Sequence, residues 1–166
     1  MAKCVIEGMD AYTRQLERLE ADALPIIQKS LYDGAKVMAD AISSAIDSIP
    51  IRNNREFGSE DNVLSGITAT QRDGLKASFG ISPMSDRNNQ QSVKCGFDGY
   101  NNVKTKTYPN GQPNQLIARS IESGTSWLQP CHFMSRAINA NRAAAEAKMA
   151  ETCDAEIAKR TTGGLI

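Results

Sequence analysis

The chain has 166 residues and a mass of 18.0 kDa, which suits one ordinary domain and is too little for two. Its 19 basic and 19 acidic side chains give a formal net charge of zero, which argues against a strongly basic nucleic-acid binder. No apolar run approaches the roughly 20 residues of a membrane-spanning helix, and Glu7 and Asp10 interrupt any apolar leader. We therefore expect a single domain over residues 1–166, without a membrane span or a signal peptide.

The N-terminal third of the chain predicts one short strand and two helices. Residues 3–6 favour a β-strand, and apolar side chains then recur every three or four residues over 9–23, which is typical of an amphipathic helix. Pro25 suits the first turn of a second helix, which should end near residue 48, before Pro50. The predicted buried stripe of this second helix comprises Ile27, Leu31, Gly34, Met38, Ile42, Ala45 and Ile49.

The middle of the chain predicts two paired strands between long polar loops. Residues 51–72 and 100–115 are polar, and we expect both to be mobile loops. Residues 74–81 and 92–98 alternate apolar and polar side chains, which is typical of half-buried strands. We expect these two strands to pair as an antiparallel hairpin with a wide, polar connection.

The C-terminal third predicts a short helix and a long one. The short helix covers residues 116–123 and ends at Gly124, and an alanine-rich helix runs from 133 to about 160. Its predicted buried face comprises Met134, Ile138, Ala145, Met149 and Cys153. Because strands and helices do not alternate regularly, the sequence predicts an α+β fold. A small antiparallel β-sheet would pack against long amphipathic helices, including the long C-terminal helix.

The cysteines and the single histidine form no recognisable reactive site. The spacing of Cys4, Cys95, Cys131 and Cys153 matches no zinc framework, and free thiols are expected, although two disulfides in any of three connectivities stay open. His132 directly follows Cys131, and adjacent side chains rarely face each other as a catalytic thiolate and imidazole must. We predict no catalytic residue, no metal, no cofactor and no enzymatic activity, with a Cys/His hydrolase as a less favoured alternative.

Charged side chains elsewhere are interpreted mainly as solvated surface. Glu151 and Glu156 fall on the pattern of the last helix, where a solvated face is the usual explanation for carboxylates. A nucleic-acid-binding module stays open as another alternative, and its candidate cations are Arg52, Arg55, Lys104 and Lys106.

Three short motifs occur in a characteristic order. Residues 73–78 read Asp-Gly-Leu-Lys-Ala-Ser, residues 117–126 read Ile-Ala-Arg-Ser-Ile-Glu-Ser-Gly-Thr-Ser, and residues 130–134 read Pro-Cys-His-Phe-Met. Their order resembles a family of small neck, head–tail joining or tail-completion proteins of long-tailed bacteriophages. In that family a short helix with Gly-Thr-Ser precedes a Pro-Phe step and a long C-terminal helix. Here Cys131 and His132 separate Pro130 from Phe133, and the loop over 51–72 is longer than usual.

The resemblance implies a structural virion protein that forms a homo-oligomeric ring of six or twelve copies at the head–tail junction. Such a ring would join the phage connector or head-completion protein to the tail-tube protein, and DNA would pass through it without specific binding. The subunits would assemble in the cytoplasm of the host bacterium. A tail terminator protein, which caps the tail tube, is the alternative within the same setting.

The residues proposed to contact other subunits gather around the end of the short helix. They are Glu122, Gly124, Thr125, Trp127, Leu128 and Phe133. Glu122 is poorly placed against the dipole of its own helix unless a cation or neighbouring N–H groups receive its carboxylate. Gly124 permits a positive φ, and Thr125 can cap the residues after it. Trp127 and Leu128 are predicted to be an exposed pair, either a lid over the sheet or an anchor in a subunit interface.

Overall fold

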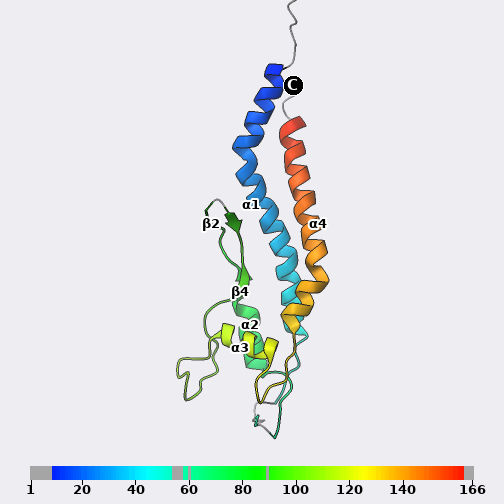
Figure 1. Cartoon of the computed structure of the whole chain (residues 1–166). Coiled ribbons are helices and arrows are strands. Elements are labelled where there is room, and N and C mark those ends of the chain that lie inside the picture. The colour runs from blue at the N-terminus through cyan, green and yellow to red at the C-terminus, as the bar shows by residue number, and fades with distance from the viewer. Residues whose placement is uncertain (1–8, 54–57, 60, 89, 163–166) are drawn as a thin grey trace, which may run out of the picture.

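The computed structural model describes residues 9–162 except 54–57, 60 and 89, so the strand expected at 3–6 lies outside the described residues. Two long helices, α1 (Met9–Asp47) and α4 (Phe133–Thr162), run antiparallel and side by side (Figure 1). At one end of this hairpin lie α2 (Ala69–Ser78) and α3 (Asn114–Ser123), and four short strands extend from there along α1 (Figure 1). We call this end the head. The predicted α+β class, with its long C-terminal helix, is confirmed.

A single helix replaces the two that the sequence predicts before Pro50. Pro25 lies inside α1, so the prediction of a helix boundary there is wrong. Proline removes one backbone N–H from the helix. Pro25 is exposed, so the carbonyl that loses its partner can turn to water. Ion pairs from Asp22 and Lys29 to α4 hold the helix on both sides of the proline.

The predicted buried stripe of α1 is right at Gly34 but wrong at its first residue. Ile26 and Ser30 are buried in that region, whereas Ile27 is exposed. In the second half the prediction is right for Ile42 and Ile49. Gly34 permits close contact with α4, because a Cβ on it would collide with the Met149 side chain. Of the predicted face of α4, Ala145 is buried, and the half-buried members are Met134, Ile138, Met149 and Cys153.

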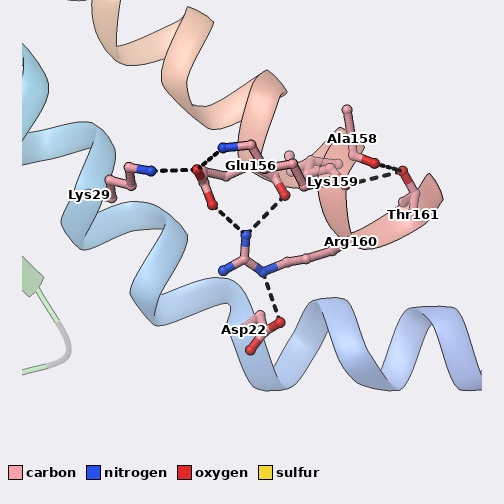
Figure 2. Close-up of polar contacts among 8 residues, drawn as sticks. Asp22, Lys29, Glu156, Ala158, Lys159, Arg160 and Thr161 are labelled. Carbon is pink, nitrogen blue, oxygen red and sulfur yellow. Dashed lines mark hydrogen bonds and ion pairs between the residues drawn. The ribbon is translucent and has the colours of Figure 1, made fainter. Parts of the chain in front are cut away.

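A polar cluster connects the two long helices far from the head (Figure 2). Glu156 is 7% exposed and accepts hydrogen bonds from Lys29 at 2.6 Å, Lys159 at 2.8 Å and Arg160 at 2.7 Å. Arg160 also donates to Asp22 at 2.8 Å. Hydrogen bonds from Lys159, Lys29 and Arg160 hold the pKa of Glu156 well below its ordinary value. The interpretation of Glu156 as a solvated carboxylate is therefore wrong, whereas Glu151 is indeed exposed.

The predicted strand pair forms, but its first strand is much shorter than expected. β1 (Phe79–Ile81) pairs antiparallel with β4 (Cys95–Phe97), with Phe79 opposite Phe97. Residues 74–78 belong to α2 instead of the strand, because Thr68 and Gln71 form a capping box that starts a helix at Ala69. Between β1 and β4, where a polar turn was expected, β2 (Ser85–Arg87) pairs with β3 (Gln90–Ser92).

The hydrophobic core lies where the head meets the hairpin. Its fully buried members come from α1, α2 and α3 and the residues beside them: Ile42, Ile46, Ile49, Leu75 and Ile121. The Phe97 ring packs 5.1 Å from Phe79 and 6.4 Å from Phe133, measured between ring centroids. Leu64 and Ile67 are also core residues, so this part of the loop expected to be mobile is packed against the head.

Candidate interaction surface

Glu122 connects the end of α3 to the start of α4. Its carboxylate accepts hydrogen bonds from the backbone N–H groups of Met134 at 2.9 Å and Ser135 at 3.1 Å, and from the Ser135 hydroxyl. These N–H groups belong to the first turn of α4, which has no intrahelical partner for them. Partial burial raises the pKa of Glu122, but the hydrogen bonds from Ser135 and Met134 outweigh it and lower the pKa below its ordinary value. Neighbouring N–H groups thus bind the Glu122 carboxylate, which is one of the two arrangements expected from its position at the end of a helix.

A tight turn after α3 fixes the position of Trp127. Gly124 has φ +74°, and a Cβ on it would come within 2.9 Å of Pro130 Cδ. The Thr125 N–H donates to the Leu128 carbonyl at 2.8 Å, and the Thr125 hydroxyl accepts from the Trp127 N–H at 3.4 Å. The positive φ at Gly124 and the capping role of Thr125 are therefore confirmed.

The side chains of Trp127 and Leu128 lie in different surroundings. Trp127 is 43% exposed, whereas Leu128 is 3% exposed and belongs to the core, so the prediction of an exposed pair is wrong for Leu128. Phe133 is also buried in the core, and its side chain is not on the surface of the folded chain. Trp127 lies against Gly58, since a Cβ there would be 3.1 Å from Trp127 Cε3. Of the three large apolar candidates, only Trp127 is on the surface.

An apolar groove of about 200 Å³ lies beside Trp127. Its apolar walls comprise Ile67, Leu116, Ile117, Ile121, Trp127 and Leu128. Exposed apolar side chains lie next to it along the chain: Val63 precedes Leu64, whose N–H donates to the Trp127 carbonyl at 3.0 Å, and Ile51 pairs with Ile67. We call Ile51, Val63, Leu116 and Trp127 the Trp127 surface. Large apolar side chains that are exposed close together are typical of protein–protein interfaces.

Cys95 lies on β4, Cys153 lies on α4, and Cys131 directly precedes His132 in the segment before α4. Cys95, Cys131 and Cys153 are free thiols, and Cys4 lies outside the described residues. His132 is exposed and has φ +51°, immediately before α4 begins. Over the described part of the chain, no three His, Cys, Asp or Glu side chains are grouped as metal ligands.

The candidate nucleic-acid cations are not gathered into one described patch. Lys104 and Lys106 are exposed on the loop that projects from the head between β4 and α3 (Figure 1). Arg52 is half-buried and lines the apolar groove instead, and Arg55 lies outside the described residues.

No helix within the described ranges has an apolar stretch long enough to span a bilayer. Comparison with protein-family models, curated proteins and solved structures finds no match to this chain.

Proposed function

We propose that this chain is a structural subunit that associates with copies of itself into a ring at the head–tail junction of a tailed bacteriophage. The observation that carries the proposal is the Trp127 surface, where the exposed Trp127 and Leu116 line an apolar groove on the head. Tryptophan is enriched at the centre of protein interfaces, where its large area is removed from water. The order of the sequence motifs supports the phage setting.

The hairpin gives such a subunit a stiff, elongated body. α1 has 39 residues, which at about 1.5 Å per residue makes it roughly 58 Å long. The head, which carries the Trp127 surface, and the polar cluster around Glu156 lie towards opposite ends of this body, so a neighbour that contacts the head need not touch the polar cluster. A ring arises when such a head contact meets a different surface of the next copy and the rotation closes.

Two surfaces of the ring would then meet the connector and the tail tube, with DNA passing through the lumen. A net charge of zero is compatible with passage, because a strongly basic lumen would hold the phosphate backbone. In this proposal the chain acts by shape and contact area, with no reactive centre.

Electron microscopy of phage lysates tests whether the protein acts at the head–tail junction. We expect a phage that lacks this protein to accumulate filled heads and tails of normal length that do not join, with joining restored by the wild-type protein in trans. Tails of irregular length would indicate the tail terminator instead, because an uncapped tube has no defined stop. Normal, infectious particles without the protein would contradict both roles.

A further inference from the structure

Two glycines lie directly opposite each other at the centre of the ribbon that β1 and β4 form. Gly80 pairs with Gly96 in the register of the two strands. Side chains alternate between the two faces of a strand, so Phe79 and Phe97 belong to the other face, where their rings pack together against the core. The outer face of the ribbon therefore has no side chain at its centre.

The fold itself gives no reason for glycine at either position. Gly80 and Gly96 do not have the positive φ that is found at Gly124. A Cβ on either residue would meet no described atom within 4 Å. Glycine inside a strand weakens the strand, and it often marks a place where another group approaches the backbone closely. The open space over the pair therefore indicates a contact with a group from outside the chain.

A hollow of about 560 Å³ lies over the glycine pair, and we call it the glycine hollow. Ser82 and Pro83 line it just beyond the end of β1, and Gln115 lines it from α3. Only two of its lining residues are charged, Lys94 and Asp98. A flat floor of backbone suits a planar ring, and an aromatic side chain is a common cover for a glycine in a strand.

Three aromatic side chains are exposed among the described residues: Tyr32, Tyr100 and Trp127. The Tyr32 hydroxyl already accepts a hydrogen bond from the Met84 N–H of its own chain at 2.9 Å. Tyr100 follows Asp98 by two residues, so it belongs to the same surface as the glycine hollow. Trp127 lies on a different surface, on the tight turn after α3, and it is therefore the aromatic side chain that suits the hollow of a neighbouring copy.

We propose that Trp127 of one copy lies on Gly80 and Gly96 of the next copy. This contact rests on the proposed function, in which the head meets a different surface of its neighbour, and it identifies that second surface as the glycine hollow. Each copy then contributes one tryptophan and one hollow, so the same contact repeats from copy to copy around a ring. The indole ring, which is 43% exposed in the single chain, is removed from water on assembly.

Charges of both signs flank the two surfaces. Arg52 lines the apolar groove beside Trp127, and Asp61 is exposed on the loop that packs against Trp127. Lys94 and Asp98 line the glycine hollow. In one orientation of the neighbour, Asp61 faces Lys94 and Arg52 faces Asp98, whereas the reverse orientation brings like charges together. The charges therefore favour a single orientation of the contact.

Filling the glycine hollow tests the contact. A side chain at position 96 would meet no described atom of its own copy, so Gly96→Leu should fill the hollow and keep the fold. We expect Gly96→Leu to weaken self-association at least about tenfold in sedimentation velocity, and Gly80→Leu on the opposite strand to do the same. The matched control is Gln90→Leu, an exposed change on β3 outside the hollow, which should leave association unchanged. Urea unfolding checks that the fold of each variant is kept.

Mixing two variants tests which surfaces meet. A Gly96→Leu copy keeps Trp127 but has a filled hollow, whereas a Trp127→Ala copy keeps the hollow but has no tryptophan, because the chain contains only one. We expect each variant to associate poorly alone and the mixture to form a 1:1 complex that grows no further. The tryptophan emission, which comes only from the Gly96→Leu copy, should shift to shorter wavelength as the ring is buried.

A failure of this contact differs from a failure of self-association. If both leucine variants associate like the wild type while Trp127→Ala does not, the glycine hollow is not the second surface, and the proposed ring stands without it. A mixture that forms no complex and shows no shift in emission also overturns the contact. If the wild-type chain does not self-associate at all, the contact and the ring are both wrong.

Discussion

Glu122 belongs to one helix by sequence and to another by its hydrogen bonds. At the last turn of α3 its charge opposes the dipole of its own helix, but it also lies at the first turn of α4, where the dipole favours an anion. The carboxylate satisfies two N–H groups that would otherwise lack partners. The same side chain therefore lies in the last turn of α3 and caps the first turn of α4.

Removing the charge of Glu122 should destabilise the fold in neutral solution. We expect Glu122→Gln to lower the free energy of unfolding by about 1 kcal/mol, as the loss of a helix cap does. The matched control is Glu146→Gln, an exposed change on α4, the helix that Glu122 caps, and it should stay within about 0.5 kcal/mol of the wild type. Urea unfolding at pH 7 measures both.

The effect of Glu122 should also depend on pH. Its pKa is lower in the folded chain than in the unfolded one, so its stabilisation is present above the unfolded pKa and is lost as the pH falls through the folded pKa. The difference between wild type and Glu122→Gln should therefore close in acid. A difference that stays constant from pH 7 to strongly acidic solution would show that the charge of Glu122 does not cap α4.

At the scale of elements, α1 and α4 are held together differently along their length. Near the head, apolar side chains such as Ile42 and Ile46 fill the contact. Farther away, Ile26 is still buried, but the buried positions also include Ser30, Thr152 and Glu156, so polar contacts are added to apolar packing. Glu156 is the buried member of this cluster, whereas Lys29 and Lys159 are more than half exposed, so removing Glu156 takes the shared acceptor from three cations.

We expect Glu156→Ala to lower the melting temperature clearly more than Glu151→Ala does. Glu151 lies on the same helix and also pairs with a lysine, Lys148, but both of these side chains are exposed. Differential scanning calorimetry measures both variants. Equal shifts would mean that the cluster in Figure 2 contributes no more than an ordinary surface pair.

For the whole molecule, the main question is whether Trp127 contributes to self-association of the chain or to the stability of its fold. Trp127 keeps 43% of its surface exposed, so much of its apolar area is free to be buried by a neighbour. We expect Trp127→Ala to weaken self-association at least about tenfold, while the free energy of unfolding changes much less. Sedimentation velocity and urea unfolding give the two quantities.

Leu24→Ala is the control for this experiment. Leu24 is comparably exposed, but it lies on α1 away from the head, so its loss should leave association unchanged. If Trp127→Ala reduces stability and association equally, the side chain acts as part of the fold and the interface proposal loses its support.

The sequence predicted those features that depend on local pattern. The steady spacing of apolar residues indicates α4, Gly124 ends α3, and alternation indicates the pairing of β1 with β4. The continuation of α1 through Pro25 was missed, because the ion pairs that flank Pro25 join α1 to residues more than 120 positions later and leave no local signal. The start of α2 was missed although Thr68 and Gln71 have the spacing of a capping box, a signal that could have been recognised.

The candidate surface was only partly predictable, for a related reason. Trp127 could be singled out from its residue type, but the groove beside it combines Ile67, Leu116 and Leu128 from separate segments. Leu128 follows Trp127 directly and yet is buried, because the turn after Gly124 directs the two side chains to different surroundings. Such an outcome depends on tertiary packing and has no local signal.

The antiparallel course of α1 and α4 places the beginning of one and the end of the other at the same place, remote from the head (Figure 1). A gold label attached to an exposed side chain near this shared end of the two helices would therefore lie far from Trp127. In micrographs of assembled particles, the radius at which such labels appear would reveal directly whether each subunit turns its head inward or outward.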